Sequence, residues 1–314
     1  MSKVTIAIPT YNRKEYLKEC IRSILDQTFQ NFEIIVFDNH SDYNIKGFIS
    51  QFNDKRIKLI INEENLGSRG NFRKIFNYKF NSKYIIIFHD DDTMHSYLID
   101  EEVELLEKNS DIVFVATEIN FVKDSKKMNE FSKTDYNNLH LSIYRGASSL
   151  VRLILLSFNL CYDSVMYRSN ILEDMAPYDT EFSKWGDRPY LINLSKKGKV
   201  AILKEKLVNY RIHKNQDSQL ESLDKTNYLF NLFLFYKKNL LQPLSKKDKK
   251  LFYSFSTNNL ILSGFSFSKN WEGYKKFLKQ AKTKDIFKLR YLNIKGVYYF
   301  FKGVKNIFLE KWIK

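Results

Sequence analysis

The chain has 314 residues, of which 44% are hydrophobic and 28% are charged, and this composition excludes a disordered or low-complexity protein. Its formal net charge of +15 lies entirely in residues 236–314, which hold 19 basic and 4 acidic residues, while the preceding 235 residues hold 32 of each. A neutral body with a basic C-terminal region indicates that this region meets an anionic surface.

Strands and helices alternate through the first 122 residues. Apolar runs predict strands at residues 4–9, 32–38, 57–62, 84–89 and 111–122. Apolar residues at helical spacing, such as Leu17, Ile21 and Ile24, predict helices between them, around residues 17–25, 45–52, 68–80 and 96–108. This alternation predicts an α/β fold with a mostly parallel sheet, flanked by helices and joined by right-handed crossovers.

The pattern changes after residue 122. A charged segment at residues 123–135 predicts a loop or hairpin, and a helix at 147–157, a strand at 164–167, a helix from Asp187 and a strand near 200–208 follow. Beyond about residue 218 the sequence reads as helical, with a hinge at residues 242–250. We therefore expect an α/β domain over residues 1–218 and a helical, basic region over residues 219–314.

Polar residues gather directly after each of four predicted strands. These groups are Thr10-Tyr11-Asn12, Asp38-Asn39, residues 62–65 and Asp90-Asp91-Asp92. Because ligands of open α/β sheets lie beyond the carboxyl ends of the strands, we expect all four groups to share one edge of the sheet.

The three consecutive carboxylates Asp90, Asp91 and Asp92 follow the near-continuous apolar run of residues 84–88. Adjacent like charges repel, so a folded protein holds them together most easily around a cation. Oxygen ligands suit Mg²⁺ or Mn²⁺, which are usually shared with substrate phosphates. The alternatives are a solvated acidic turn and a helix N-terminus stabilised by the helix dipole.

An ordered set of motifs gives the chain a resemblance to a known family. The segments are IAIPTYNRKEYLKECIRSILDQTFQNFEIIVFDNHSD, NLGSRGN, HDDD, SVMYR, WGDRPYL and YRIHKNQDS, in this order within residues 3–218. Together they resemble the family 2 glycosyltransferases of the GT-A fold that build bacterial surface polysaccharides. The resemblance implies an inverting hexosyl- or hexosaminyltransferase that moves a sugar from a nucleoside-diphosphate donor, with UDP favoured, to a glycan hydroxyl in surface polysaccharide, capsule or lipopolysaccharide synthesis.

The resemblance assigns nucleotide-binding roles to residues after the first two strands. The turn after the first strand would line the nucleotide pocket through Pro9, Thr10, Tyr11 and Arg13, although a plain strand-to-helix loop is the alternative. Asp38 would accept a hydrogen bond from the uracil ring, or else it forms a turn or caps a helix. Many relatives carry a second acid where this chain has Asn39, so which residue reads the base stays open.

A further donor contact is implied at Asn65, Gly67 and Asn71, which open a helix. Gly67 permits close approach of the backbone, and the helix N-terminus offers free N–H groups. An ordinary N-cap with a turn glycine is the alternative.

The aspartates stand where the family carries its metal-binding D-x-D motif. Asp92 would ligate Mn²⁺ or Mg²⁺, and Asp90 would contact the ribose or a metal-bound water, with the register among Asp90, Asp91 and Asp92 open. The motif YRIHKNQDS resembles a late loop of the family that closes over the diphosphate. In this motif, Arg211 would pair with phosphate oxygens, and His213 would ligate the metal or donate to a phosphate. Ser218 would contact the donor.

Asp187, in the motif KWGDRPY, is the candidate general base. In enzymes that the chain resembles, an acid at this motif removes the proton of the acceptor hydroxyl. Asp187 could instead cap the helix that begins at Arg188.

The C-terminal residues predict an amphipathic helix. Its apolar residues follow helical spacing, and they are Val297, Phe300, Phe301, Val304, Ile307 and Phe308. Lys295, Lys302, Lys305 and Glu310 fall largely elsewhere around the helix. A basic helix with aromatic residues suits a membrane interface, but it could equally pack on the protein's own core or on a second subunit.

Two other classes of function compete with the glycosyltransferase. A metal-dependent nucleotidyltransferase would also use acids at strand ends, but no Gly- and Lys-rich loop follows the first strand. A non-catalytic glycan- or nucleic-acid-binding protein would not need Asp92 and Asp187. We expect a nucleotide-sugar donor, a glycan acceptor that could be lipid-linked, and no nucleic acid as partners.

The expected location is the cytoplasm, with peripheral contact at the inner face of the cell membrane. The N-terminus does not resemble a signal peptide, because Pro9 ends its short apolar run. Cys20 and Cys161 lie in predicted elements without metal-ligand spacing and are expected as reduced thiols. The sequence contains no run of about 18 apolar residues, so we expect no membrane-spanning helix.

Overall fold

The computed structural model describes residues 2–123, 128, 131, 139–172, 181–182, 185–214, 216, 225–268, 270–294, 296–302 and 304. The chain divides into two compact units, which we call the sheet unit (residues 1–146, 159–179 and 190–220) and the helical unit (residues 147–158, 180–189 and 221–314). The predicted division at residue 218 falls outside the described residues and stays a prediction.

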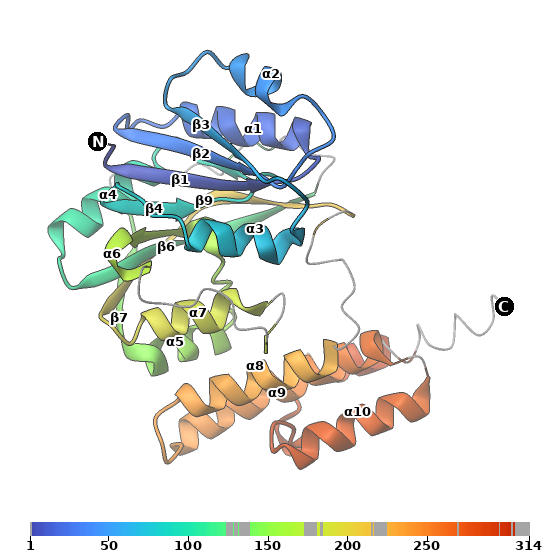
Figure 1. Ribbon diagram of the computed structural model, residues 1–314. Coiled ribbons are helices and arrows are strands. Elements are labelled where there is room, and N and C mark those ends of the chain that lie inside the picture. The colour runs from blue at the N-terminus through green and yellow to red at the C-terminus, as the bar shows by residue number, and fades with distance from the viewer. Residues whose placement is uncertain are drawn as a thin grey trace. The chain divides into compact units, whose positions relative to one another are not determined.

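One mixed sheet forms the centre of the sheet unit (Figure 1). Within the described residues it has nine strands in the order β3-β2-β1-β4-β8-β6-β9-β5, with β7 also paired to β9. Their bounds are β1 Val4–Thr10, β2 Phe32–Asp38, β3 Ile57–Ile61, β4 Tyr84–Ile87, β5 Thr93–Met94, β6 Ile112–Lys123, β7 Leu141–Arg145, β8 Val165–Arg168 and β9 Lys199–Ile212.

The predicted parallel pairing of the main strands is confirmed, and three antiparallel strands make the sheet mixed. β1 to β4 pair in parallel, and β6 pairs in parallel with β9. β8 lies between β4 and β6 and is antiparallel to both, so β6 still runs in the same direction as β4. The short strands β5 and β7, both antiparallel to β9, were not predicted.

Helices cover both faces of the sheet (Figure 1). The helices of the sheet unit are α1 Lys14–Leu25, α2 Ile45–Ser50, α3 Gly67–Phe76, α4 Leu98–Lys108, the 3₁₀ turn η1 Tyr162–Ser164, α6 Ser169–Leu172 and the second part of α7 Asp187–Leu194, whose residues 187–189 belong to the helical unit. Because strand side chains alternate, Ile6 and Ile8 of β1 pack against Leu17 and Ile21 of α1 in one core cluster, together with residues of α2 and α4. Each fully buried aliphatic side chain of this kind contributes about 1.5–3 kcal/mol.

The carboxyl ends of the first strands are level with one another, as predicted. Thr10 is paired with Asp38, and Asp38 with Ile61. The ladder continues one residue further, because Asn39 N donates to the Thr10 carbonyl and Asn62 N to the Asp38 carbonyl, each at 2.9 Å. The polar groups that follow β1, β2, β3 and β4 therefore share one edge of the sheet.

The helical unit contains most of α5 Gly146–Leu155 and all of α8 Lys225–Asn239, α9 Lys246–Phe267, α10 Trp271–Thr283 and the 3₁₀ turn η3 Leu289–Tyr291. The predicted hinge at residues 242–250 is too long: α9 already begins at Lys246, because the Ser245 hydroxyl caps it by accepting from Asp248 N at 3.0 Å. In the described part of the chain, no helix is long and apolar enough to cross a membrane.

Candidate active site

The carboxylate cluster lies directly after β4, at the shared edge of the sheet. Asp90, Asp91 and Asp92 are all buried, with exposed fractions of 2%, 5% and 1%. Thr10, the last residue of β1, donates its hydroxyl to Asp90 Oδ2 at 2.7 Å. The end of the neighbouring strand therefore fixes the orientation of the first aspartate.

Two basic residues contact these carboxylates. Arg13 Nη1 lies 3.1 Å from Asp90 Oδ1 and 3.2 Å from Asp91 Oδ2. His213 Nε2 lies 2.8 Å from Asp91 Oδ2. The structure thus brings together Thr10, Arg13, His213 and the aspartates, all of which the sequence had placed in one site.

Arg211 was predicted in a loop, and this was wrong, because β9 continues to Ile212 and pairs Arg211 with Val122 of β6. Its backbone N donates to Asp92 Oδ1 at 2.7 Å, and its Nε donates to the Asp91 carbonyl at 2.8 Å. The guanidinium also pairs with Glu19 and lies over the Tyr16 ring, 4.5 Å from its centroid. β9 therefore holds the acidic cluster from the side opposite β1.

Burial and crowding shift the pKa values of the three aspartates in different directions. Burial, followed by the charges of Asp163 and Asp91, raises the pKa of Asp92 well above its usual range. Burial and Asp91 raise the pKa of Asp90 to about 6. Burial also acts to raise the pKa of Asp91, but the hydrogen bond from His213 and the charges of His89 and Arg13 lower it below its usual range.

A divalent cation fits this cluster. Asp92 Oδ2 is buried and finds no hydrogen-bond partner among the described residues. Candidate ligand atoms of His89, Asp91 and Asp92 all lie within 4.8 Å of one another. The sequence had named Asp92, Asp90 and His213 as ligands. Asp92 is common to both sets, and the ligand roles of Asp90 and His213 stay predictions.

Asp163 and His89 form a pair that sequence reasoning missed. Asp163 lies in η1 and is fully buried. Its Oδ1 accepts from His89 N at 3.0 Å and lies 3.0 Å from His89 Nδ1, while Cys161 Sγ donates to Oδ2 at 2.9 Å. Burial alone would lower the pKa of His89, but Asp163, followed by Asp92 and Asp91, raises it to about 10.

The predicted base-reading residues after β2 are engaged within the sheet edge. Asp38 is fully buried, and its carboxylate accepts from Ser41 N at 3.1 Å and from Ser41 Oγ at 2.6 Å. Asn39 Oδ1 accepts from Asn62 Nδ2 and from Leu66 N, both at 2.9 Å. The contacts of Asp38 with Ser41 are the turn contacts that the alternative for Asp38 predicted, and base reading by Asp38 or Asn39 stays a prediction.

The loop before α3 is fastened to the end of β2 by asparagines. Asn39 Nδ2 donates to Asn65 Oδ1 at 2.7 Å, and the same oxygen accepts from Gly67 N at 2.8 Å. Gly67 has a φ of +69°, a conformation that favours glycine. Asn71 is buried and donates to the Phe37 carbonyl at 2.9 Å. Donor contacts by Asn65, Gly67 and Asn71 stay predictions.

The remaining predicted residues lie in different surroundings. Pro9 is the penultimate residue of β1, and Tyr11 is exposed by 39% just after that strand. Asp187 is the first residue of α7 and belongs to the helical unit, where its Oδ1 accepts from Arg188 N at 2.8 Å. Its role as the base stays a prediction. Ser218 lies outside the described residues.

The chain resembles curated glycosyltransferases in sequence, among them the following two. An uncharacterised glycosyltransferase of Methanocaldococcus jannaschii is 30% identical over 228 residues, which cover 71% of this chain and 74% of the relative. The UDP-Glc:α-D-GlcNAc-diphosphoundecaprenol β-1,3-glucosyltransferase WfgD of Escherichia coli is 28% identical, over 43% of this chain and 54% of WfgD.

Solved structures share the fold at low sequence identity. S. aureus TarS 1–349 in complex with UDP-GlcNAc superimposes with a TM-score of 0.64 at 14% identity, over 90% of this chain and 80% of TarS. The mannosyltransferase PcManGT of Pyrobaculum calidifontis, in complex with GDP-Man and Mn²⁺, gives 0.53 at 12% identity, over 96% of this chain and 79% of that one.

The sequence profile of glycosyl transferase family 2 matches residues 5–175, more than half of the chain, and this stretch contains β1 from its second residue, β2 to β4 and the carboxylate cluster that follows them. The chain belongs to glycosyltransferase family 2 and is a glycosyltransferase with the GT-A fold.

Proposed function

We propose that this glycosyltransferase takes a sugar from a nucleoside diphosphate, with UDP favoured, and adds it with inversion to a hydroxyl of a lipid-linked glycan during bacterial surface-polysaccharide synthesis. The observation that carries the proposal is the buried Asp92 Oδ2, which accepts no hydrogen bond from the described residues and lies beside two further carboxylates at the carboxyl edge of the sheet. Such an oxygen is stabilised by a cation, and a cation there suits a diphosphate.

Mn²⁺ or Mg²⁺ would be held by Asp92 with Asp90 and His213. When bound, the ion supplies charge that neutralises the departing nucleoside diphosphate. Mn²⁺ in the mannosyltransferase of P. calidifontis supports this choice by analogy of fold. Arg13 supports it as well, because its guanidinium already lies within 3.2 Å of two of the aspartates and offers positive charge to phosphate oxygens.

Asp187 is proposed to act as the general base. It accepts the proton of the acceptor hydroxyl while that oxygen attacks the anomeric carbon, and the bond from that carbon to the diphosphate oxygen breaks with its electron pair leaving on the nucleotide. Attack from the side opposite the leaving group inverts the anomeric centre. Asp187 is half-buried at the start of α7, so a helix terminus fixes its backbone.

The donor and the acceptor class are inferred from relatives. WfgD, by its name, uses UDP-Glc and a diphosphoundecaprenol-linked acceptor, and TarS has been solved with UDP-GlcNAc. A hexose or hexosamine donor linked to UDP, and a glycan on a lipid diphosphate, are therefore the proposed substrates. The basic C-terminal region supports an acceptor with negative charge.

Hydrolysis of a panel of nucleotide sugars with Mn²⁺ tests the proposal and identifies the donor. We expect slow hydrolysis of one UDP-sugar, lost on chelation of the metal and lost in Asp92→Asn. Consumption of nucleoside triphosphates with release of pyrophosphate would instead establish a nucleotidyltransferase. If glycans bind while every nucleotide sugar stays intact with and without a lipid-linked acceptor, the catalytic proposal is wrong.

A further inference from the structure

The helical residues 296–302 pack on α9 and α10 through one side of their helix. The Phe300 ring lies 5.8 Å from the Phe265 ring of α9 and 6.3 Å from the Trp271 ring of α10. Gly296 is buried against Asn258, whose Oδ1 would lie 1.9 Å from a Cβ at that position. The segment is therefore part of the helical unit rather than a free tail.

Apolar residues that flank this packed side are exposed. Val297, Tyr298 and Phe301 are exposed by 40%, 60% and 66%. Trp271, which contacts Phe300, is itself exposed by 43%. Isolated exposed apolar residues need no explanation, but a contiguous group of aromatic ones marks an interaction surface.

Basic side chains accompany this group. Lys275 Nζ lies over the Trp271 ring, 5.8 Å from its centroid, and the exposed Lys302 follows Phe301 in the chain. We name Trp271, Lys275, Val297, Tyr298, Phe301 and Lys302 the aromatic–basic patch. The patch therefore combines exposed aromatic and aliphatic side chains with two lysine ammonium groups.

The exposed charge of residues 237–302, which include the patch, is almost entirely positive. Among the described residues of 237–302, twelve lysines and arginines are exposed, and the exposed acids are Glu272 and Asp285. Asp285 is already engaged by Lys237 at 2.6 Å and by Lys288 at 3.1 Å. The surface of this unit therefore carries a field that attracts anions.

We infer that the aromatic–basic patch docks on an anionic lipid bilayer. Aromatic side chains bury their rings at the boundary of headgroups and acyl chains, and lysines contact the anionic headgroups. A second copy of this chain fits poorly, because a two-fold contact would oppose lysine to lysine. A nucleic acid would satisfy the lysines but leave Val297 without a matching partner. The inference does not depend on which donor the enzyme uses.

Co-sedimentation of the full chain with vesicles tests the inference without any substrate. We expect binding to vesicles of phosphatidylcholine with phosphatidylglycerol, little binding to pure phosphatidylcholine, and strong weakening when salt rises from about 0.05 M to about 0.5 M. Because substrate is absent, failure of the proposed donor or acceptor chemistry does not affect this result. Absence of binding to the anionic vesicles by a normally melting protein would overturn the inference.

Two matched pairs of variants locate the contact. Phe301→Ser is compared with Leu241→Ser, because Leu241, in the connection between α8 and α9, is exposed by a similar 64%. We expect roughly tenfold weaker vesicle binding for Phe301→Ser and no change for Leu241→Ser, given the usual worth of a partly buried aromatic ring. Equal losses in the two variants would contradict docking through the patch.

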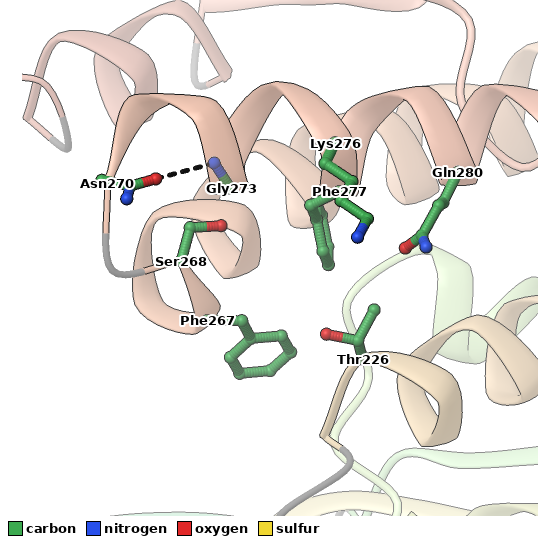
Figure 2. Close-up of a pocket in the computed structure, with 8 residues that line it drawn as sticks. All are labelled: Thr226, Phe267, Ser268, Asn270, Gly273, Lys276, Phe277 and Gln280. Atoms are coloured by element: carbon green, nitrogen blue, oxygen red, sulfur yellow. Dashed lines mark hydrogen bonds between the residues drawn. The ribbon is translucent and has the colours of Figure 1, made fainter.

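The second pair compares neighbouring lysines of α10. Lys276 lines a hollow of about 400 Å³ together with Gln280, Thr226 and Phe267. Figure 2 shows these side chains. Lys275, by contrast, lies over the Trp271 ring. Lys275→Gln should weaken vesicle binding roughly fivefold, since each lysine near an anionic surface contributes about 1 kcal/mol, and Lys276→Gln less. Self-association without vesicles that is lost in Phe301→Ser would overturn the lipid assignment in favour of a second copy of the chain. An RNA that competes with vesicles for wild type but not for Phe301→Ser would overturn it in favour of a nucleic acid.

Discussion

Asp163 lies opposite His89 in the antiparallel register of β4 with β8, which pairs Ile86 with Met166, because each of the two residues stands three positions beyond that pair and two beyond the end of its strand. One carboxylate oxygen thereby meets both the backbone N–H and Nδ1 of His89, each at 3.0 Å. The histidine is in turn the residue that precedes the three aspartates. Asp163 therefore acts on the carboxylate cluster through the backbone and the ring of His89.

Replacing Asp163 should destabilise the fold strongly. Asp163→Ala leaves the buried backbone N–H of His89 without its acceptor and removes the partner of the ring, and each buried unsatisfied polar group costs about 1–3 kcal/mol. We expect the free energy of unfolding, from urea titration, to fall by about 3–5 kcal/mol. The control Glu63→Ala removes an exposed acid and should change it by less than about 0.5 kcal/mol. Similar losses in the two variants would refute the structural role of Asp163.

Replacing Asp92 should remove metal-dependent binding but not the fold. Burial and neighbouring acids raise the pKa of Asp92, so the ionised carboxylate is costly without a cation and a neutral amide is tolerated. Asp92→Asn should therefore melt at or above the wild-type temperature in chelator, and it should lose the Mn²⁺-dependent part of UDP binding in calorimetry. Undiminished metal-dependent binding in this variant would contradict the assignment of Asp92 as a ligand.

Much of the sheet followed from local patterns. β2 was predicted with its observed bounds, because a continuous apolar run is closed by the polar turn after Asp38. The level carboxyl ends of β1 to β4 followed from the alternation of strands and helices, which forces parallel pairing. The place of the aspartates after β4 could therefore be predicted before their contacts were known.

The missed features depend on pairing between distant segments. β7 alternates between half-buried and exposed residues and is a strand because β9 lies beside it. β9 continues through Arg211 because β6 offers a partner as far as Lys123, although the motif reads locally as a loop. Likewise, no residue spacing in the sequence predicts the contact between His89 and Asp163, because that contact requires β8 to insert between β4 and β6. The sequence also left open which group the Asp38 carboxylate binds, and in the structure it accepts a hydrogen bond from the Ser41 hydroxyl.

Replacing Asp187 should separate binding from chemistry. An asparagine at this position can still accept from Arg188 N and start α7, so Asp187→Asn should keep the fold and the affinity for the donor. Without a base, turnover should fall by about 10²–10⁴-fold. Steady-state rates and donor calorimetry on the same preparation measure both quantities, and Glu272→Gln, an exposed acid of the same unit, serves as the control. A loss of donor binding in Asp187→Asn would exclude its role as the base.

The ion pair between Arg152 and Asp248 should give the helical unit a pH-dependent stability. Arg152 of α5 donates to both carboxylate oxygens of Asp248 in α9, from Nε at 2.7 Å and from Nη2 at 2.9 Å. The hydrogen bonds from Arg152 lower the pKa of Asp248 below its ordinary value of 3.8, although burial opposes them. A carboxyl whose folded pKa is depressed stabilises the fold above its unfolded pKa, and this stability is lost as the pH falls towards the folded pKa.

Asp248→Asn should therefore lower the free energy of unfolding by about 1–3 kcal/mol at pH 7, since hydrogen bonds to charged groups contribute about this much and Arg152 is partly solvated. The difference between wild type and variant should shrink as the pH falls below about 4, where the unfolded carboxyl of the wild type becomes protonated. Arg152→Lys keeps the charge but loses the two-pronged contact, so its stability should lie between those of wild type and Asp248→Asn. Urea titrations from pH 7 to pH 3 measure all three proteins, and a difference that stays constant across this range would show that the ionised pair contributes nothing.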